Sequence, residues 1–306
     1  MSYHEPVMAS QCIEQLAIQP DGTYVDVTFG GGGHSRLILE QLGENGRLVA
    51  FDQDEDAQAN LPEDERLVFA PANFRYLQRY LRLYGIKQVD GILADLGVSS
   101  HQLDVAERGF SFRFEADLDM RMNQSDGPTA AEILAHTAVD ELQYVFGTFG
   151  EVRNARTLAK RIAEAREEQP IERIGELVAI AEPLAFGKPN RYLAQVFQAL
   201  RIAVNDEMGA LEDMLTQATE VLAPGGRFVA MSYHSLEDRM VKNVLKTGQV
   251  SGEQIKDFYG RIYRPFRILT KKPLEAEAAE VATNPRARSA KLRVGERLDS
   301  QPPAEN

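Results

Sequence analysis

The chain has 306 residues, 43% of them hydrophobic, which predicts one large domain or two, with enough apolar side chains for a core. Its net charge of −12 argues against broad nonspecific binding to nucleic acid, so any contact with RNA requires a local basic surface. No stretch approaches about 20 uninterrupted apolar residues, and residues 1–20 lack a basic start, so we expect neither a transmembrane helix nor a signal peptide.

The single cysteine and the five histidines indicate in which cell compartment the protein works and whether it binds a metal. Cys12 cannot form a disulfide within the chain, which is typical of a reducing cytoplasm. It falls on the apolar face of a predicted helix, so we interpret it as a core residue rather than a nucleophile. The histidines are scattered without the spacing of metal ligands, so no metal site is predicted.

A glycine-rich turn between a strand and a helix dominates the N-terminal part of the sequence. Residues 23–27 are apolar and β-branched, which predicts a buried strand, and residues 35–42 carry apolar side chains at helical spacing. Four consecutive glycines, residues 30–33, lie between them and leave the turn backbone open to a ligand. This order predicts the first βα unit of a nucleotide-binding α/β domain.

The spacing of the glycines bears on which nucleotide binds. The dinucleotide fingerprint needs a third glycine where this sequence has Ser35 or, in the other register, Arg36. Asp26 ends the first strand, where its carboxylate would repel a pyrophosphate but tolerate a cationic ligand without phosphate. S-adenosylmethionine, with its sulfonium and amino group, has this chemistry. A glycine turn without a ligand is the alternative, although four glycines cost backbone entropy.

Three further strands are predicted before residue 104, each followed by a candidate ligand residue. Strands and helices are expected over residues 8–17 (helix), 47–52 (strand), 54–64 (helix), 67–70 (strand), 75–84 (helix) and 89–94 (strand). Asp52 lies about 20 residues past the glycines, the spacing at which a carboxylate binds ribose hydroxyls; a solvated aspartate is the alternative. An aromatic at Phe74 could hold the adenine, and Asp95 ends the fourth strand. We expect these side chains to converge at the carboxyl edge of the sheet.

A long insertion separates the fourth strand from the next one, which is predicted within residues 222–234. Apolar residues at three- and four-residue spacing predict helices over residues 132–146, 153–168, 174–186 and 193–205. We therefore predict an S-adenosylmethionine-binding domain of residues 1–104 and 207–306, with an inserted helical substrate-binding domain of residues 105–206. Ligand pockets are common at such domain interfaces.

The C-terminal part of the chain is locally basic. Arginines and lysines cluster over residues 261–272 and 286–293, and the first cluster interleaves with four aromatic residues, Phe258, Tyr259, Tyr263 and Phe266. Contacts to RNA phosphates and bases use this combination. A solvated charged face is the alternative interpretation.

Seven motifs together resemble one known family. They are His4-Glu5-Pro6-Val7; Asp26-Val27-Thr28-Phe29-Gly30 through Gly32-Gly33-His34-Ser35; Asp95-Leu96-Gly97-Val98-Ser99-Ser100 with Gln102-Leu103-Asp104; Glu107-Arg108-Gly109-Phe110-Ser111-Phe112; Leu118-Asp119-Met120-Arg121-Met122; His234-Ser235-Leu236-Glu237-Asp238-Arg239; and Asn284-Pro285-Arg286-Ala287-Arg288-Ser289. The chain resembles a class I S-adenosylmethionine-dependent methyltransferase. It is most similar to the bacterial MraW family, also called RsmH, which methylates the exocyclic N4 of a cytidine in small-subunit (16S) ribosomal RNA.

The resemblance implies a Rossmann-like, doubly wound α/β sheet with an inserted helical domain that helps bind RNA. It implies S-adenosylmethionine as the cofactor and the small ribosomal subunit or its RNA as the partner, with no membrane and no metal; a homodimer is left open. It places seven residues at the cofactor: Gly32, Gly33, His34, Asp52, Phe74, Asp95 and Gln102. Six residues are expected to contact RNA: Arg108, Phe110, Phe112, Arg121, Arg286 and Arg288.

The expected reaction needs a positioned hydrogen-bond acceptor, because the lone pair of a cytosine amine is delocalised into the ring. The enzyme must hold the nitrogen in line with the methyl group and accept an amino hydrogen. Amino-methyltransferases of DNA place an acidic or amide side chain after the fourth strand, which is the position of Asp95. His234 is the second catalytic candidate, and Phe110, Phe112 and Tyr233 are candidates to stack on an unstacked target base.

Other functions are weighed against this one. A methyltransferase of another RNA, or of a small molecule or protein, would keep the cofactor motifs. The small-molecule and protein alternatives would leave the insertion and the basic C-terminal part unexplained. A nicotinamide dehydrogenase is disfavoured by Ser35 in the third glycine position. A non-catalytic RNA-binding module would bind RNA without transferring a methyl group.

Overall fold

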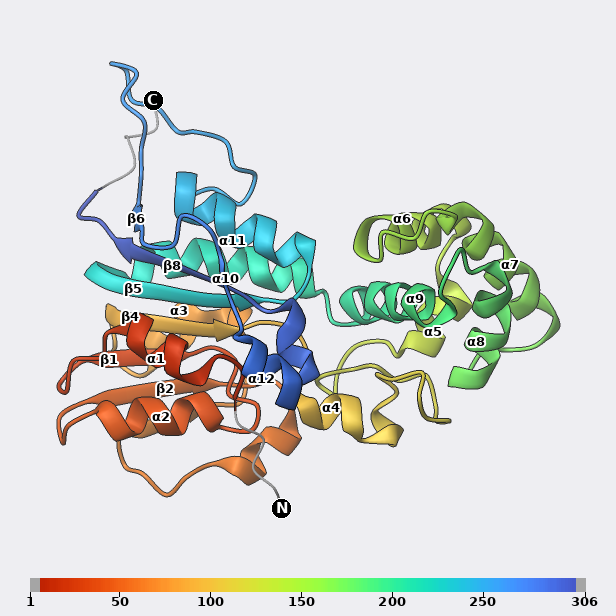
Figure 1. The fold of residues 1–306 in the computed structure, drawn as a ribbon, viewed down its shortest axis with the longest axis horizontal. Helices are drawn as coiled ribbons and strands as arrows, with labels where there is room; N and C mark the ends of the chain where they lie inside the picture. Colours follow the sequence, from red (N-terminus) through yellow and green to blue (C-terminus); the bar gives the residue numbers. More distant parts are fainter. Residues whose placement is uncertain (1–5, 301–306) are drawn as a thin grey trace. The chain divides into compact units, whose positions relative to one another are not determined.

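A computed structural model describes residues 6–300 of the chain (Figure 1), so His4 and Glu5 of the first motif lie outside the described residues. The chain divides into two units, one of Met1–Gly97 with Met208–Asn306 and the other of Val98–Glu207. We call them the sheet unit and the helical unit. The helical unit begins seven residues before the predicted boundary at residue 105, because Val98 and Leu103 pack against its apolar core.

The sheet unit is built on one sheet with the strand order β3-β2-β1-β4-β5-β8-β6, in which β7 also pairs with β8. The strands are β1 (Thr23–Asp26), β2 (Arg47–Phe51), β3 (Leu67–Ala70), β4 (Val89–Asp95), β5 (Leu222–Ser232), β6 (Phe266–Ile268), β7 (Leu274–Glu275) and β8 (Lys291–Arg297). The first five pair in parallel, and β8 pairs with β5 in the antiparallel direction. The predicted doubly wound α/β sheet is confirmed.

Both faces of this sheet are covered by helices, which explains why its strands are nearly continuous apolar runs. The covering helices, each of which buries side chains, are α1 (Ala9–Leu16), α2 (Gly33–Gln41), α3 (Leu77–Leu83), α10 (Glu207–Val221) and α11 (Ser235–Thr247). A further short helix of this unit, α12 (Ala278–Thr283), has no buried side chain. Val49 of β2 packs in one layer with Leu81 of α3, whereas Leu48 packs in the other layer with Ile38 of α2. Cys12 is buried in that second layer, as predicted for a core residue.

Two predicted helices differ in the structure. Residues 54–64 contain only a short 3-10 helix, η1 (Glu55–Asn60), because Ala57 is its one buried side chain and no apolar stripe holds a longer α-helix. The predicted helix over 132–146 is two helices, α5 (Ala130–His136) and α6 (Val139–Phe149). The guanidinium of Arg166 donates to the carbonyls of Leu134, in the last turn of α5, and of Thr137, its C-cap residue, so these two carbonyls are satisfied at the break.

The helical unit packs around its own apolar core. Its elements are α4 (Ser100–Asp104), η3 (Ala106–Arg108), α5, α6, α7 (Ala155–Glu168), α8 (Ile174–Ala181), η4 (Glu182–Leu184) and α9 (Pro189–Val204). Helix α9 contacts α5, α6 and α8 and contributes buried residues along most of its length (Figure 1). Across the described part of the chain, no helix combines the length and apolar character needed to cross a membrane.

Candidate active site

Acidic side chains from three neighbouring strands gather at the carboxyl edge of the sheet. Asp26 is the last residue of β1, Asp95 is the last residue of β4, and Asp52 directly follows β2. Strand β1 lies between the other two, with Asp26 in register with Ala50 and with Leu93. Ligands of open α/β sheets bind at this edge, as the order of the motifs predicted.

The glycine turn follows β1 and leads into α2. Gly32 has φ +74° and precedes the helix, and a Cβ atom there would lie 2.8 Å from Cζ of Phe29. No heavy atom lies within 4 Å of the Cβ position of Gly31. The turn is therefore closely packed at Gly32, where only glycine fits without strain, and open at Gly31.

Asp52 connects the β2 end to this turn. Its Oδ2 accepts a hydrogen bond from the backbone N–H of Gly30 at 2.8 Å, and its Oδ1 accepts one from Asp54 at 2.9 Å. Burial raises the pKa of Asp52 to about 6, although these two hydrogen bonds act in the opposite direction. The carboxylate is half-buried and retains lone pairs for further donors.

Asp26 is buried and anchored by hydroxyl and backbone donors. Ser35 Oγ donates to its Oδ2 at 2.7 Å and the backbone N–H of Thr28 donates to its Oδ1 at 3.0 Å. Burial raises the pKa of Asp26, and His34 and these hydrogen bonds oppose that rise. The Thr28 hydroxyl also accepts from the backbone N–H of Asp95 at 2.7 Å, so it joins the ends of β1 and β4.

Asp95 lies between a tyrosine and a histidine. The Tyr233 hydroxyl donates to Asp95 Oδ1 at 2.6 Å, and His34 Nδ1 lies 3.8 Å from Asp95 Oδ2. His34 Nε2 lies 3.1 Å from the carbonyl of Val7, which can only accept, so this nitrogen carries the hydrogen. Burial raises the pKa of Asp95, while His34 and the Tyr233 hydrogen bond lower it; burial and Asp95 raise the pKa of Tyr233.

His234 directly precedes α11 and is its N-cap residue. Its backbone N–H donates to Glu237 Oε2 at 3.3 Å, and its Nδ1 accepts from the Glu237 N–H at 3.5 Å. Its Nε2 lies 3.1 Å from Glu237 Oε1. Glu237 also accepts from the backbone N–H of Tyr233 at 2.8 Å. Both ring nitrogens of His234 therefore face Glu237.

The two remaining predicted cofactor residues lie in different units. Phe74 begins the 3-10 helix η2 (Phe74–Tyr76) after β3 and packs, half-buried, against the core of the sheet unit. Gln102 belongs to α4 of the helical unit, where its Oε1 accepts from the Ser99 N–H at 3.1 Å and completes a capping box.

Arg108 and Phe110, two predicted RNA contacts, are buried in the helical unit. The Arg108 side chain is 3% exposed and donates to the carbonyls of Arg121 and Met122 at 3.0 and 3.1 Å. Its guanidinium lies 5.8 Å from the centroid of the buried Phe110 ring. In this structure Arg108 satisfies backbone carbonyls and both side chains are buried, so their contact with RNA stays a prediction.

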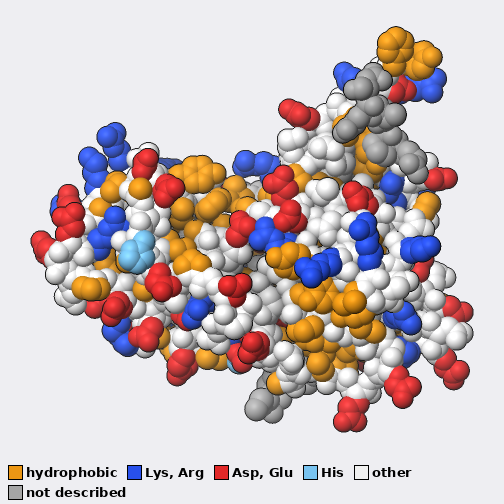
Figure 2. Space-filling model, turned by 180° about the vertical axis from the view of Figure 1, so that it is seen from behind, with side chains coloured by type: hydrophobic (Ala, Val, Ile, Leu, Met, Phe, Trp, Pro, Cys, Tyr) orange, Lys and Arg blue, Asp and Glu red, His pale blue; other side chains and the backbone are white. Residues whose placement is uncertain are grey.

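The other predicted RNA contacts are partly or fully exposed. Arg121 is half-buried and forms a two-pronged ion pair with Asp119, with both N···O distances 2.8 Å. Phe112 is half-buried and packs edge-on against Phe197. Arg286 and Arg288 lie in the 3-10 helix η5 (Pro285–Ser289), where Arg288 is exposed and Arg286 half-buried. Figure 2 shows acidic and basic side chains interspersed over one face of the molecule.

The aromatic residues of the C-terminal part divide into two pairs. Phe258 and Tyr259 are 91% and 80% exposed, their rings pack edge-on, and the Arg261 guanidinium lies 5.7 Å from the Tyr259 ring centroid. Tyr263 and Phe266 are buried in the sheet unit. Only the first pair is therefore available to a partner.

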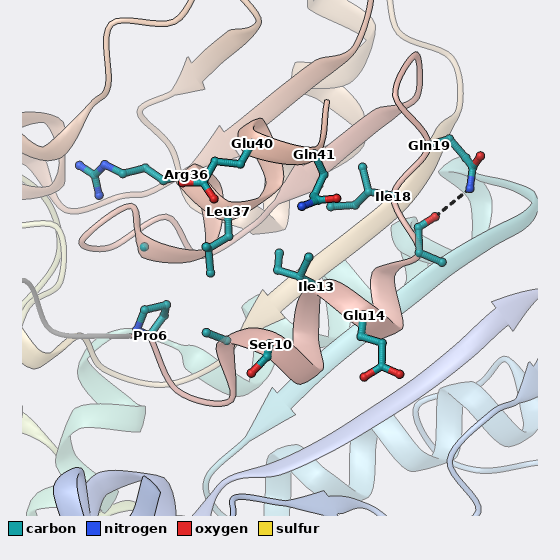
Figure 3. A pocket seen from close by; sticks show the side chains of 13 residues that line it. Pro6, Ser10, Ile13, Glu14, Ile18, Gln19, Arg36, Leu37, Glu40 and Gln41 are labelled. Carbon is teal, nitrogen blue, oxygen red and sulfur yellow. Dashed lines mark hydrogen bonds between the residues drawn. The ribbon is translucent and has the colours of Figure 1, made fainter. Parts of the chain in front are cut away.

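A cavity of the sheet unit is lined by residues of α1 and α2 and of the segments next to them (Figure 3). It has a volume of about 1030 Å³ and extends from Pro6 and Gly33 to Gln19 at the far end of α1. Among the described residues that line it, Glu14 and Glu40 are the acidic ones, and none of the three strand-end aspartates takes part. This cavity is therefore separate from the cluster of strand-end carboxylates.

The whole chain matches one known family. The model of the MraW methylase family matches residues 1–298. The chain belongs to the MraW methylase family. The predicted family resemblance and the class I methyltransferase fold are confirmed.

Relatives of this chain are similar to it over nearly their full length. It is 54% identical over 299 residues to the ribosomal RNA small subunit methyltransferase H of Bacteroides thetaiotaomicron, covering 97% of this chain and 98% of that protein. It is 51% identical to the protein of the same name from Flavobacterium johnsoniae, covering 97% and 99%. A putative rRNA-methylase structure from Clostridium thermocellum is 14% identical, with a TM-score of 0.45 and coverage of 96% and 98%.

Two contacts of the MraW site were not predicted from its sequence. We considered Ser35 only as a residue that is not glycine and Tyr233 only as a base-stacking candidate, whereas they bind Asp26 and Asp95. A hydroxyl residue in the first turn of the helix, two positions after the last glycine, is a signal that could have indicated the first contact. No local signal indicates the second, because Tyr233 and Asp95 are 138 residues apart.

Proposed function

We propose that this chain transfers a methyl group from S-adenosylmethionine to the exocyclic N4 of a cytidine in small-subunit (16S) ribosomal RNA, in the cytoplasm. Family membership and the names of the relatives support the RNA substrate. The observation that carries the chemistry is Asp95, a carboxylate held by Tyr233 and adjacent to His34 at the carboxyl edge of the sheet.

The residues at this edge suit the cofactor. S-adenosylmethionine, when bound, supplies an electrophilic methyl group on a sulfonium. Three aspartates favour a ligand with a sulfonium and an ammonium, and the open backbone at Gly31 lets a ligand approach the turn. Asp52 would accept hydrogen bonds from two ribose hydroxyls, and Phe74 would lie against the adenine. Gly32, Gly33 and His34, with Asp95 and Gln102, would hold the methionine part.

Asp95 is proposed as the residue that orients the target amine. An ionised carboxylate accepts a hydrogen bond from the N4 amino group, and this bond strengthens as positive charge develops on nitrogen. The Tyr233 hydroxyl occupies one oxygen of Asp95 and so directs the other oxygen toward its partner. The cytidine must be unstacked from its neighbours to reach this carboxylate.

Methyl transfer leaves the N4 nitrogen with one proton to release. Asp95 is the first candidate to accept it because the pKa of this carboxyl is raised, and a raised pKa makes a stronger base. His234 is the second candidate. Its ring nitrogens face Glu237, so a catalytic role would require the imidazole to leave the cap of α11.

The proposed RNA contacts outside the active site are Arg121, Arg286 and Arg288, with Phe112 as a stacking residue. Arg288 is the most available of the three cations, since Arg121 is paired with Asp119. A methyltransferase of another RNA, or of a small acceptor, is the alternative function, which the same cofactor site would serve.

The decisive experiment uses small subunits that lack the modification. Incubation with methyl-labelled S-adenosylmethionine, followed by digestion to nucleosides, is expected to give labelled N4-methylcytidine. Protein-free RNA and small cytosine nucleosides serve as parallel substrates. Label at a carbon or at another base would contradict the N4 assignment, and label in the small nucleosides alone would favour the small-acceptor alternative.

A further inference from the structure

Most basic side chains of the helical unit are already neutralised or bound. Acidic residues outnumber basic ones between Val98 and Glu207, and five arginines pair with them: Arg113 with Asp104, Arg121 with Asp119, Arg161 with Glu164, Arg173 with Glu115 and Asp117, and Arg201 with Glu207. Arg108 and Arg166 donate to backbone carbonyls.

Five other cations in this unit have no such partner. Within residues 98–207, all of which the structure describes, five basic side chains take part in no hydrogen bond or ion pair, and all five are exposed: Arg153, Arg156, Lys160, Lys188 and Arg191. They occur in two short stretches of the sequence, one at the start of α7 and one at the start of α9.

The fold brings these two stretches together. The side-chain amide of Asn154, next to the start of α7, donates to the Leu184 carbonyl at 2.9 Å. Leu184 ends η4, and Lys188 follows four residues later, directly before α9. Helix α8 contacts both α7 and α9, and η4 contacts α8 and α9; Figure 1 shows α7 and α8 on the same side of the helical unit. The unpaired cations of an acidic unit therefore collect in one region.

The surface has features that suit phosphate groups. Arg156 and Lys160 are one helical turn apart on α7 and line a hollow of about 320 Å³ with Thr157, Arg161 and Glu164. A guanidinium matches two phosphate oxygens in a planar fork, and a hydroxyl adds a further donor. Phe186, in the loop before Lys188, is 76% exposed and offers a ring on which an unpaired base can stack.

We propose that this α7–α9 cationic surface (Arg153, Arg156, Lys160, Lys188 and Arg191) binds the phosphate backbone of the substrate RNA. The proposal rests on the function proposed above and adds a surface distinct from the motif residues that the sequence suggested. Contacts of this kind position the substrate without reading its bases, so they supply affinity rather than specificity. An acidic protein surface would also attract these cations, and the experiment separates the two partners.

The test replaces three of the cations with neutral residues of similar length, in the triple variant Arg156→Gln/Lys160→Gln/Arg191→Gln. Binding to small subunits and to protein-free small-subunit RNA is measured over a series of salt concentrations. We expect at least a tenfold weaker affinity for both at moderate salt. The slope of log affinity against log salt should fall by about two to three units. S-adenosylmethionine affinity and the turnover number at saturating RNA should change less than twofold.

A matched control has the same change of charge elsewhere. Arg79, Arg82 and Lys87 of the sheet unit are also exposed, and the triple variant Arg79→Gln/Arg82→Gln/Lys87→Gln should keep wild-type affinity within twofold. Equal losses in the two triple variants would overturn the surface, since a general charge effect would explain them. A loss seen with small subunits but not with protein-free RNA would assign the surface to a protein partner and overturn the proposal as well.

The same measurements distinguish this surface from the proposed function. If the wild-type protein binds RNA through these cations but yields no N4-methylcytidine, the proposed reaction is wrong and the surface stands. If N4-methylcytidine forms and the triple variant binds and reacts like the wild type, the reaction stands and the surface is wrong.

Discussion

The Tyr233 hydroxyl donates a 2.6 Å hydrogen bond to Asp95 Oδ1 and joins the residue after β5 to the last residue of β4. Because Asp95 pairs in register with Met231, two residues before Tyr233, the neighbouring strands bring the two side chains together. The hydrogen bond stabilises the ionised form of a carboxylate whose pKa is raised by burial.

Removal of this hydroxyl in Tyr233→Phe should shift the pH dependence of methylation. The hydrogen bond lowers the pKa of Asp95, so its loss raises that pKa, and the ionised carboxylate forms only at higher pH. In a plot of single-turnover rate against pH, the acid limb should shift to higher pH by about 0.5–1 unit. Cofactor affinity should stay within threefold. An unchanged acid limb in a folded variant would show that the ionisation of Asp95 does not control the rate of methylation.

Asp95→Asn tests the proposed role of the charge itself. The amide keeps the shape and an acceptor but removes the negative charge that strengthens the hydrogen bond in the transition state. Single-turnover methylation should fall ten- to a thousandfold, on the order of 1.4–4 kcal/mol, with cofactor affinity changed less than fivefold by calorimetry. Proportional loss of binding and activity would assign Asp95 to the cofactor alone, and His234 would become the leading candidate.

Asp52 should make cofactor binding depend on pH. Its carboxyl has a pKa of about 6, above the ordinary value of 3.8, so it is mostly protonated at pH 5 and mostly ionised at pH 7.5. Ribose hydroxyls bind the ionised form more strongly, so affinity should rise through this interval. Asp52→Asn should weaken binding at pH 7.5 about tenfold, as for a charge-assisted hydrogen bond of about 1.5–3 kcal/mol, and should flatten the profile. A steep profile that survives the substitution would assign the titration to Asp26 or Asp95.

Two neighbouring glycines should respond differently to alanine. Gly32→Ala introduces a side chain at φ +74° and 2.8 Å from the Phe29 ring, so we expect the free energy of unfolding to fall by about 1–3 kcal/mol. Gly31→Ala adds a methyl group to open space and should change stability by less than about 1 kcal/mol. Urea unfolding measures both. Equal effects would show that the packing at Gly32 is not what requires glycine.

Substitution of Arg108 should affect stability, whereas substitution of Arg288 should affect RNA binding. Arg108→Gln loses a buried guanidinium that satisfies two carbonyls, which should lower the free energy of unfolding by about 2–4 kcal/mol. Its salt slope for RNA should match that of the wild type. Arg288→Gln removes an exposed charge and should leave stability unchanged while lowering the salt slope by about one unit or less. The reverse pattern would assign Arg108, and not Arg288, to the RNA contacts.

The residue order alone determined the strands and the edge at which the acidic residues meet. Residues 67–70 form β3 as predicted, and Asp26 and Asp95 end β1 and β4. These features depend on local apolar runs and on the polar residues that end them, so neighbouring residues carry the information. The glycine turn before α2 could likewise be predicted from neighbouring residues alone.

Only the tertiary structure decided which side chains meet across long separations. Tyr233 reaches Asp95 because β5 pairs with β4. Arg166 of α7 donates hydrogen bonds at the C-terminal end of α5, although about 30 residues separate the two positions. Arg108 is buried although arginine is usually exposed. The hydrogen bond from Asn154 to the Leu184 carbonyl holds the starts of α7 and α9, with their basic side chains, in one region of the helical unit. Burial and pairing depend on how distant segments pack, and a local pattern of polar and apolar residues does not contain that information.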